Sequence, residues 1–180
     1  MAYYIELDSS DRDRYAYANP HKYQLEPAQV QTWSQSGFGT SQTVRMSVKC
    51  ENVIIPYVAA LKDEPRLYLD VHTVNMDDPF KVGCLDGNHR RAKFVLIQDK
   101  IQNNSADTPA WIHFKACGMA QILRFRRGDP LAIEIFDRFG DTVDGNDTAD
   151  PDDDIDDTKQ TYILLSLEPY SNTPTRVDTY

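Results

Sequence analysis

Three aspartates spaced two residues apart, Asp150, Asp152 and Asp154, form the pattern that comes closest to a metal site. Carboxylates at this spacing supply the first three ligands of an EF-hand calcium loop. The rest of that pattern fails, because Ile155 stands where the loop turns on a glycine and Thr161 where it needs a bidentate glutamate. The three aspartates are therefore retained only as candidate ligands. The expected structure is a solvated acidic loop, and the sequence predicts no cofactor.

No spacing typical of a metal centre or a catalytic group is found among the four histidines, which are His21, His72, His89 and His113. His72 and His113 fall on the polar side of alternating segments, where surface histidines are expected. A nucleophile elbow and a glycine-rich phosphate loop are absent from the sequence as well. The sequence therefore predicts that the chain is not an enzyme.

Trp111 is a candidate for contact with a ligand or with another protein. In the alternating segment 111–116, Ile112 and Phe114 form the apolar side and Trp111 lies on the polar side. Its indole ring is therefore expected to face solvent in part. A half-exposed tryptophan can stack on a sugar or pack in an interface, and burial at a sheet edge is the competing expectation. Trp111 keeps open an alternative function, a β-sandwich module that binds a glycan or a receptor, with or without calcium.

The acidic excess of the chain is local. The formal net charge is −9, and residues 137–157 hold ten aspartates and one arginine, which give the same value. Acidic and basic residues therefore balance in the rest of the chain. A balanced body exerts little long-range attraction on nucleic acid, so no direct contact with DNA or RNA is expected.

The opening segment is dense in turn-forming residues and in charges of both signs. Residues 8–14 read Asp-Ser-Ser-Asp-Arg-Asp-Arg, and an Asn-Pro pair follows at 19–20. If residues 11–17 are extended, the two arginines point one way and the aspartates and tyrosines the other. Such a segment can offer guanidinium groups and rings to a neighbouring subunit, or brace the end of the domain. The expected assembly contacts are Arg12, Asp13, Arg14, Tyr17, Asn19 and Pro20.

This segment resembles an N-terminal signature of small capsid proteins from large double-stranded DNA viruses of eukaryotes. In that signature a short strand precedes Asp-Ser-x-Asp-Arg-Asp, then Tyr-Pro-Asn-Pro, then an aromatic-x-apolar strand start. The chain departs from it at Ala18, where the family usually has a proline. The resemblance implies a single jelly-roll subunit of the capsid shell, a penton or minor capsid protein. The matching residues are Asp8, Ser9, Asp11, Arg12, Asp13, Tyr17, Asn19, Pro20, Tyr23 and Leu25.

The elements that must position these residues are strands. Apolar and polar residues alternate with period two in six segments, three shorter segments add candidates, and no segment sustains a helical period. We therefore expect an all-β fold, an antiparallel two-sheet sandwich of about eight strands, and the resemblance implies that this sandwich is a single jelly roll. The candidate strands are residues 3–7, 23–25, 44–50, 67–71, 92–97, 112–116, 121–126, 131–135 and 163–167, and residues 100–109 are expected to be a polar connection.

The length of 180 residues suits one domain. We expect a single β-sandwich domain over 1–180, with an N-terminal arm over about 1–25, an acidic loop over about 140–158 and a C-terminal tail over about 169–180. Cysteine adds no metal spacing, and we expect Cys50 and Cys117 to be buried.

The expected partners are further copies of the chain, in a homo-oligomer such as a pentamer, and other capsid proteins. The sequence has no basic leader and no long apolar run, so neither a secretory signal nor membrane insertion is expected. The expected location is the capsid of the virion, after synthesis in the reducing cytoplasm of a host cell.

Overall fold

The computed structural model describes residues 3–27, 43–58, 61–74, 82–83, 91–105, 108–118, 120–126, 128–143 and 160–170. Within these ranges the regular structure consists of strands and one 3₁₀ turn, η1. The elements are β1 (Tyr3–Asp8), η1 (Ser9–Asp11), β2 (Lys22–Leu25), β3 (Thr43–Pro56), β4 (Arg66–Thr73), β5 (Val82–Gly83), β6 (Arg91–Ala92), β7 (Phe94–Ser105), β8 (Thr108–Cys117), β9 (Gln121–Arg126), β10 (Leu131–Phe136) and β11 (Tyr162–Pro169).

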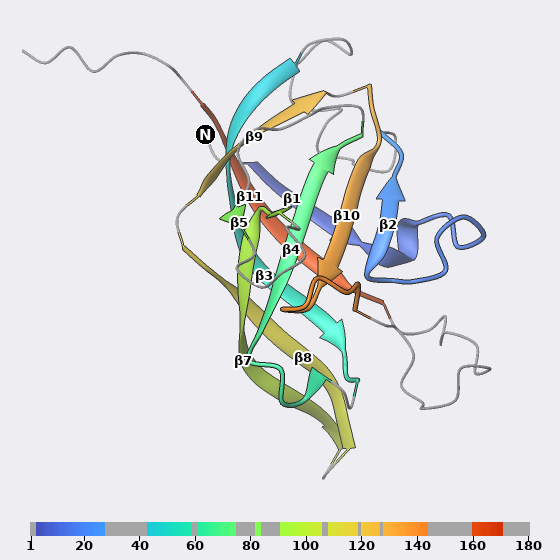
Figure 1. Ribbon diagram of the computed structural model, residues 1–180. Helices are drawn as coiled ribbons and strands as arrows, with labels where there is room; N and C mark the ends of the chain where they lie inside the picture. The colour runs from blue at the N-terminus through green and yellow to red at the C-terminus, as the bar shows by residue number, and fades with distance from the viewer. Residues whose placement is uncertain are drawn as a thin grey trace, which may run out of the picture.

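Nine of the described strands form one antiparallel sheet that curls on itself (Figure 1). The hydrogen-bonded order is β1-β11-β3-β8-β7-β4-β10-β2, with β9 paired to β3, and β5 and β6 form a separate two-stranded ribbon. Because β3 is 14 residues long, it pairs with β9 along its first half and with β8 near its end, while β11 runs along its other edge. The curl places β4, β10 and β2 in front of β3 and β11 in Figure 1.

The prediction of an all-β, antiparallel, sandwich-like fold is confirmed. The hydrogen bonds nevertheless form one continuous path through β3, so the finer division into the two sheets of a jelly roll stays a prediction. Eight of the nine candidate segments are strands in the structure, and the ninth, 92–97, is divided at Lys93 between the end of β6 and the beginning of β7. Period-two patterning succeeds here because each strand has one face toward the core and one toward solvent.

The core fills the inside of the curl and consists of the apolar side of each alternating strand. Leu67, Leu69 and Val71 of β4 are fully buried there, as are Ile112 and Phe114 of β8. Nearly all of the buried hydrophobic residues belong to a single contiguous cluster. The burial of apolar area in this cluster supplies the main driving force for folding.

The β7–β8 hairpin is longer than the sequence indicates. The polar connection expected at residues 100–109 is instead the end of one strand and the beginning of the next, with Gln102 opposite Trp111. Three shifts of register interrupt the pairing. Polar residues can extend a hairpin in this way because each strand satisfies the backbone groups of the other, and bulges absorb the extra residues.

The prediction for the cysteines is half right. Cys50 is buried, but Cys117 is exposed at the end of β8. Cys117 has the parity of Trp111 and His113, which is opposite to that of the buried Ile112, so it lies on the outer face of the sheet.

Candidate assembly surface

The N-terminal segment is built into the sheet at both of its ends. β1 pairs with β11 over its whole length, and β2 pairs with β10 in the same way. These two strands lie at opposite ends of the strand order. Residues 9–21 therefore cross from one margin of the curled sheet to the other, rather than form a free arm.

Between these strands the chain folds into turns, so the extended geometry expected for residues 11–17 is wrong. Asp8 Oδ1 caps η1 by accepting a hydrogen bond of 2.8 Å from the backbone N–H two residues later. Asp13 Oδ1 accepts from Tyr15 N at 3.0 Å, and Tyr17 N donates to Asp13 O at 2.8 Å. Short polar side chains compete with extended structure because they satisfy nearby backbone groups.

Arg12 is the centre of this turn-rich segment, and its side chain is buried. Its Nε donates to Tyr17 O at 2.8 Å, its Nη1 to Ser9 O at 2.6 Å and its Nη2 to Ala18 O at 2.9 Å. Its Nη1 also donates to Gln160 Oε1, at 2.5 Å, just before β11 begins. The planar guanidinium thus closes residues 9–18 into a loop and attaches that loop to the far end of the chain.

The next residues face outward. Asp13 and Arg14 are exposed, and the side chain of Tyr15 is fully exposed, with a relative accessible area of 105%. Tyr17 turns back and packs in part against the core. The predicted assembly residues therefore divide: Arg12 and Tyr17 support the loop from within, whereas the turn at 13–16 is available to a neighbouring molecule.

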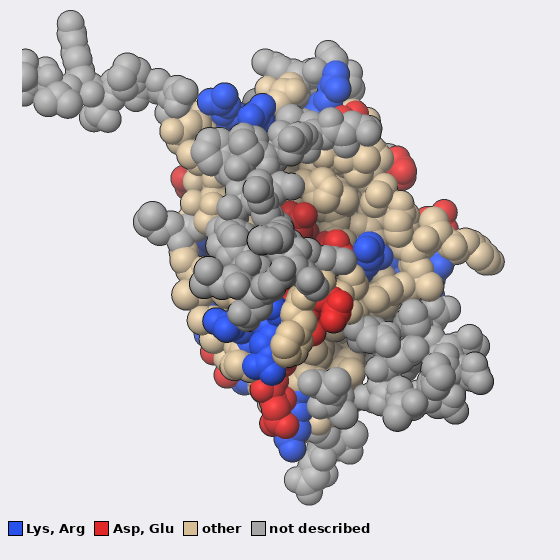
Figure 2. Space-filling view, in the orientation of Figure 1, with Lys and Arg blue, Asp and Glu red and all other residues tan. Residues whose placement is uncertain are grey.

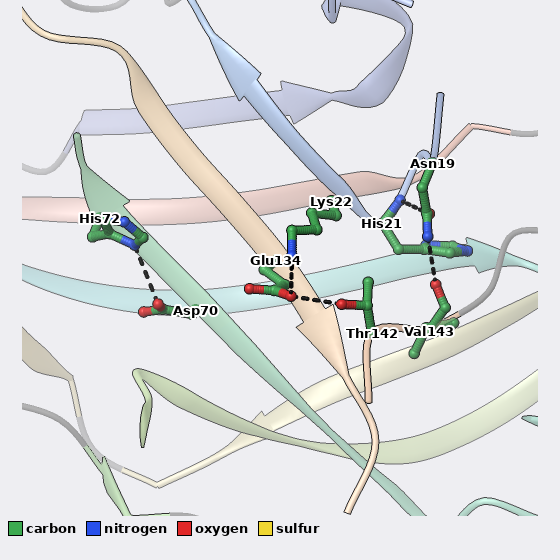
Figure 3. Close-up of polar contacts among 8 residues, drawn as sticks. All are labelled: Asn19, His21, Lys22, Asp70, His72, Glu134, Thr142 and Val143. Carbon is green, nitrogen blue, oxygen red and sulfur yellow. Dashed lines mark hydrogen bonds and ion pairs between the residues drawn. The ribbon is translucent and has the colours of Figure 1, made fainter. Parts of the chain in front are cut away.

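Asn19 fastens the end of the segment to the residues that follow β10. Its Nδ2 donates to Val143 O at 2.9 Å, and its Oδ1 accepts from His21 N at 2.8 Å (Figure 3). Pro20, which lies between Asn19 and His21 in the sequence, is buried. An Asx-type contact of this kind fixes the turn that leads into β2.

His21 is a buried residue whose importance the sequence does not reveal. Its Nδ1 lies 2.8 Å from Thr161 Oγ1, and Thr161 N donates to Ser9 Oγ at 2.8 Å. Among the described residues its Nε2 has no hydrogen-bond partner. Burial, followed by the positive charge of Arg12, lowers the pKa of His21 from 6.5 to about 3, so the imidazole is neutral at physiological pH.

A row of charged side chains crosses the outer face of β2, β10 and β4 beside this segment (Figure 3). Lys22 Nζ lies 3.1 Å from Glu134 Oε1, and Thr142 Oγ1 donates to the same oxygen at 2.6 Å. Asp70 is directly opposite Glu134, and its Oδ2 lies 3.1 Å from His72 Nδ1. Lys22 and Glu134 form a stabilising cross-strand pair, whereas His72 and Asp70 both lie on β4. These contacts place His72 on the polar side of its strand, as the alternation predicts.

Of the remaining predicted site residues, Trp111 is half-buried on β8, and Asp150, Asp152 and Asp154 lie outside the described residues. In the part of the chain that the structure describes, no three acidic, histidine or cysteine residues come together as a metal site would require. On the face shown in Figure 2, basic and acidic side chains are interspersed in small groups. The described portion of the chain contains no helix with the length and apolar character needed to cross a membrane.

The comparisons with known proteins leave the chain without a family. No protein-family model matches it, and no curated protein matches it.

Proposed function

We propose that the chain is a structural subunit of a viral capsid shell, a penton or minor capsid protein with a single jelly-roll domain. It assembles through its loops and its N-terminal segment. The observation that carries the proposal is the construction of residues 8–21, the segment that resembles the capsid signature. There a buried arginine holds a tight turn whose charged and aromatic side chains face solvent.

The physical argument concerns the entropy of association. A flexible loop loses conformational freedom when it binds, and that loss weakens the interface. Here Asp13 and Arg12 already hold the backbone of the turn, so docking costs little backbone entropy. Tyrosine and arginine are also the residue types that contribute most often to the energetic centre of an interface.

The partners that follow from this function are other copies of the chain and other capsid proteins, and the location that follows is the virion. The buried residues of the signature stabilise the fold, and the exposed residues contact the neighbouring subunit. Arg12, Asn19 and Pro20 therefore have a positioning role, whereas Asp13, Arg14 and Tyr15 meet the neighbouring subunit.

Co-assembly tests the proposal. The chain is mixed with the major capsid protein encoded by the same genome, and the chain recovered in sedimenting particles is measured. The Arg14→Ala/Tyr15→Ala variant should lose most of this recovery while its melting temperature stays unchanged. The matched control is Tyr170→Ala, which removes an exposed tyrosine just after β11, at the end of that strand remote from Gln160.

A wild-type chain that neither associates with itself nor enters particles would overturn the proposed function. Full recovery of the double variant would overturn the role given to the turn at 13–16.

A further inference from the structure

On the outer face of the β7–β8 hairpin, a tryptophan lies beside polar side chains that point away from the core. Trp111 is directly opposite Gln102, and His113 is directly opposite Lys100. Ile112, between the two residues of β8, is fully buried, so Trp111 and His113 both lie on the solvent side of the sheet. Pro56 of β3 flanks Trp111 on its other side.

The polar pair next to the indole has a defined hydrogen-bonding sense. His113 Nε2 lies 2.9 Å from Gln102 Oε1. An amide oxygen only accepts hydrogen bonds, so Nε2 must carry the proton and Nδ1 is left as an acceptor. The amide nitrogen of Gln102 is a donor. Burial, and then the charge of Lys100, lowers the pKa of His113, which keeps the ring neutral at physiological pH. One free acceptor and one free donor therefore stand beside the ring.

A positive charge completes the group. Lys115 of the same face is paired with Asp99, with Nζ and Oδ2 3.0 Å apart. Lys100 has no ion pair within the described residues, and it is exposed. Lys100 is therefore free to pair with the anionic group of a ligand, whereas Lys115 already has its counter-ion.

We propose that this face binds an acidic carbohydrate. A pyranose ring has one apolar face of C–H groups, which fits the indole of Trp111, and a rim of hydroxyls that both donate and accept, which fits Gln102 and His113. The carboxylate of the sugar pairs with Lys100. We name these four residues, Lys100, Gln102, Trp111 and His113, the hairpin site.

The surroundings of Trp111 favour a sugar over a macromolecule. A protein partner needs an apolar centre wider than one ring, and Lys100 and Gln102 are both exposed polar residues. A nucleic acid needs several cations along its backbone, and the hairpin site has one unpaired lysine. A single sugar unit needs only one ring, one donor–acceptor pair and one charge.

Fluorescence titration tests the inference. The Trp33→Phe variant leaves Trp111 as the only tryptophan, because the chain has two. 3′-Sialyllactose should quench or shift its emission in a saturable way, and lactose should bind roughly tenfold more weakly, since it lacks the carboxylate. Lys100→Gln should reduce 3′-sialyllactose binding to the level of lactose.

The remaining variants separate binding from folding. Gln102→Ala should weaken the binding of both sugars without a change in the melting temperature of the protein, because Gln102 is exposed. Trp111→Ala, followed by ligand-observed NMR, should abolish binding, and Tyr15→Ala should leave it intact. Equal affinity for the two sugars, the absence of any saturable signal, or unchanged binding in Trp111→Ala or Gln102→Ala would each overturn the proposal.

Discussion

Two largely polar segments, residues 8–21 and residues 98–105, are held in place by different forces. The first is fixed by side chains that reach distant residues, such as Ser9 Oγ, which donates to Gln160 Oε1 at 2.8 Å across 151 positions of sequence. The second is fixed by backbone pairing between neighbouring strands; Ile101 packs against the core, and Lys100, Gln102 and Asn103 are exposed. The first segment therefore depends on the identity of a few buried residues. The second leaves its surface residues free to serve a ligand.

Removal of the buried guanidinium should have the largest effect. Arg12→Ala leaves the carbonyl oxygens of Tyr17 and Ala18 without their guanidinium donor, and stranded buried groups of this kind cost about 1–3 kcal/mol each, with incomplete additivity. It also removes one of the two donors to Ser9 O and one of the two donors to Gln160 Oε1. We expect a loss of roughly 3 kcal/mol or more in the free energy of unfolding, measured by urea denaturation. The control Arg14→Ala should stay within about 0.5 kcal/mol of wild type.

This expectation replaces the simpler view in which Arg12 and Arg14 act together at an interface. Equal and small effects of the two substitutions would contradict the contrast between a bracing and an exposed arginine.

Acid should weaken the first segment more than the hairpin. The unfolded chain protonates His21 near pH 6.5, whereas the folded chain keeps it neutral down to a pKa of about 3. The unfolded state thus binds more protons over this window, so stability is complete above pH 6.5 and falls as the pH falls. The His21 contribution should be roughly 2 kcal/mol smaller at pH 5 than at pH 7.

The measurement is the melting temperature as a function of pH for wild type and for His21→Gln. The difference between the two curves isolates His21 from the carboxylates, and the surface variant His72→Gln is the control. A wild-type curve parallel to that of His21→Gln would show that this imidazole is not the source of the acid sensitivity.

Asn19 should make an intermediate contribution. Asn19→Ala removes the donor to Val143 O and the acceptor of His21 N, a loss of about 1–2 kcal/mol in the free energy of unfolding. In Asn19→Ala, amide hydrogen exchange should become faster than in wild type for the residues after β10, and should stay unchanged in β7. An equal change in exchange rate in the two regions would argue against a specific stabilising role of Asn19 at this end of the segment.

The smallest effect is expected in the hairpin. Gln102→Ala removes one exposed side-chain contact and leaves the strand pairing intact, so its free energy of unfolding should change by less than about 0.5 kcal/mol. Thermal denaturation checks this. A loss as large as that of Asn19→Ala would mean that the hairpin also depends on side-chain identity.

The strands and their buried faces could be predicted because period-two alternation is a local signal that burial of one face enforces. Leu67, Leu69 and Phe114 are examples, and all three are fully buried. The role of Arg12 could not be predicted in this way. Its partners include Gln160, which is near in space only because β1 pairs with β11. An arginine beside aspartates in sequence looks like a surface charge.

His21 and the end of the β7–β8 hairpin escaped prediction for related reasons. The contact of His21 with Thr161 spans 140 positions, and no local pattern marks it. Residues 102–105 are all polar in the sequence, so alternation carries no signal there, and only the pairing with β8 makes them a strand. Trp111 was identifiable because its parity opposes that of Ile112.

A cryo-electron microscopy reconstruction of the assembled shell would show whether the turn at 13–16 contacts a neighbouring subunit. We expect density for one or more copies of this β fold in the shell, with residues 13–16 against a neighbouring subunit and Arg12 still buried within its own chain. A shell without the fold, or one in which Tyr15 faces solvent and contacts no neighbour, would contradict this expectation.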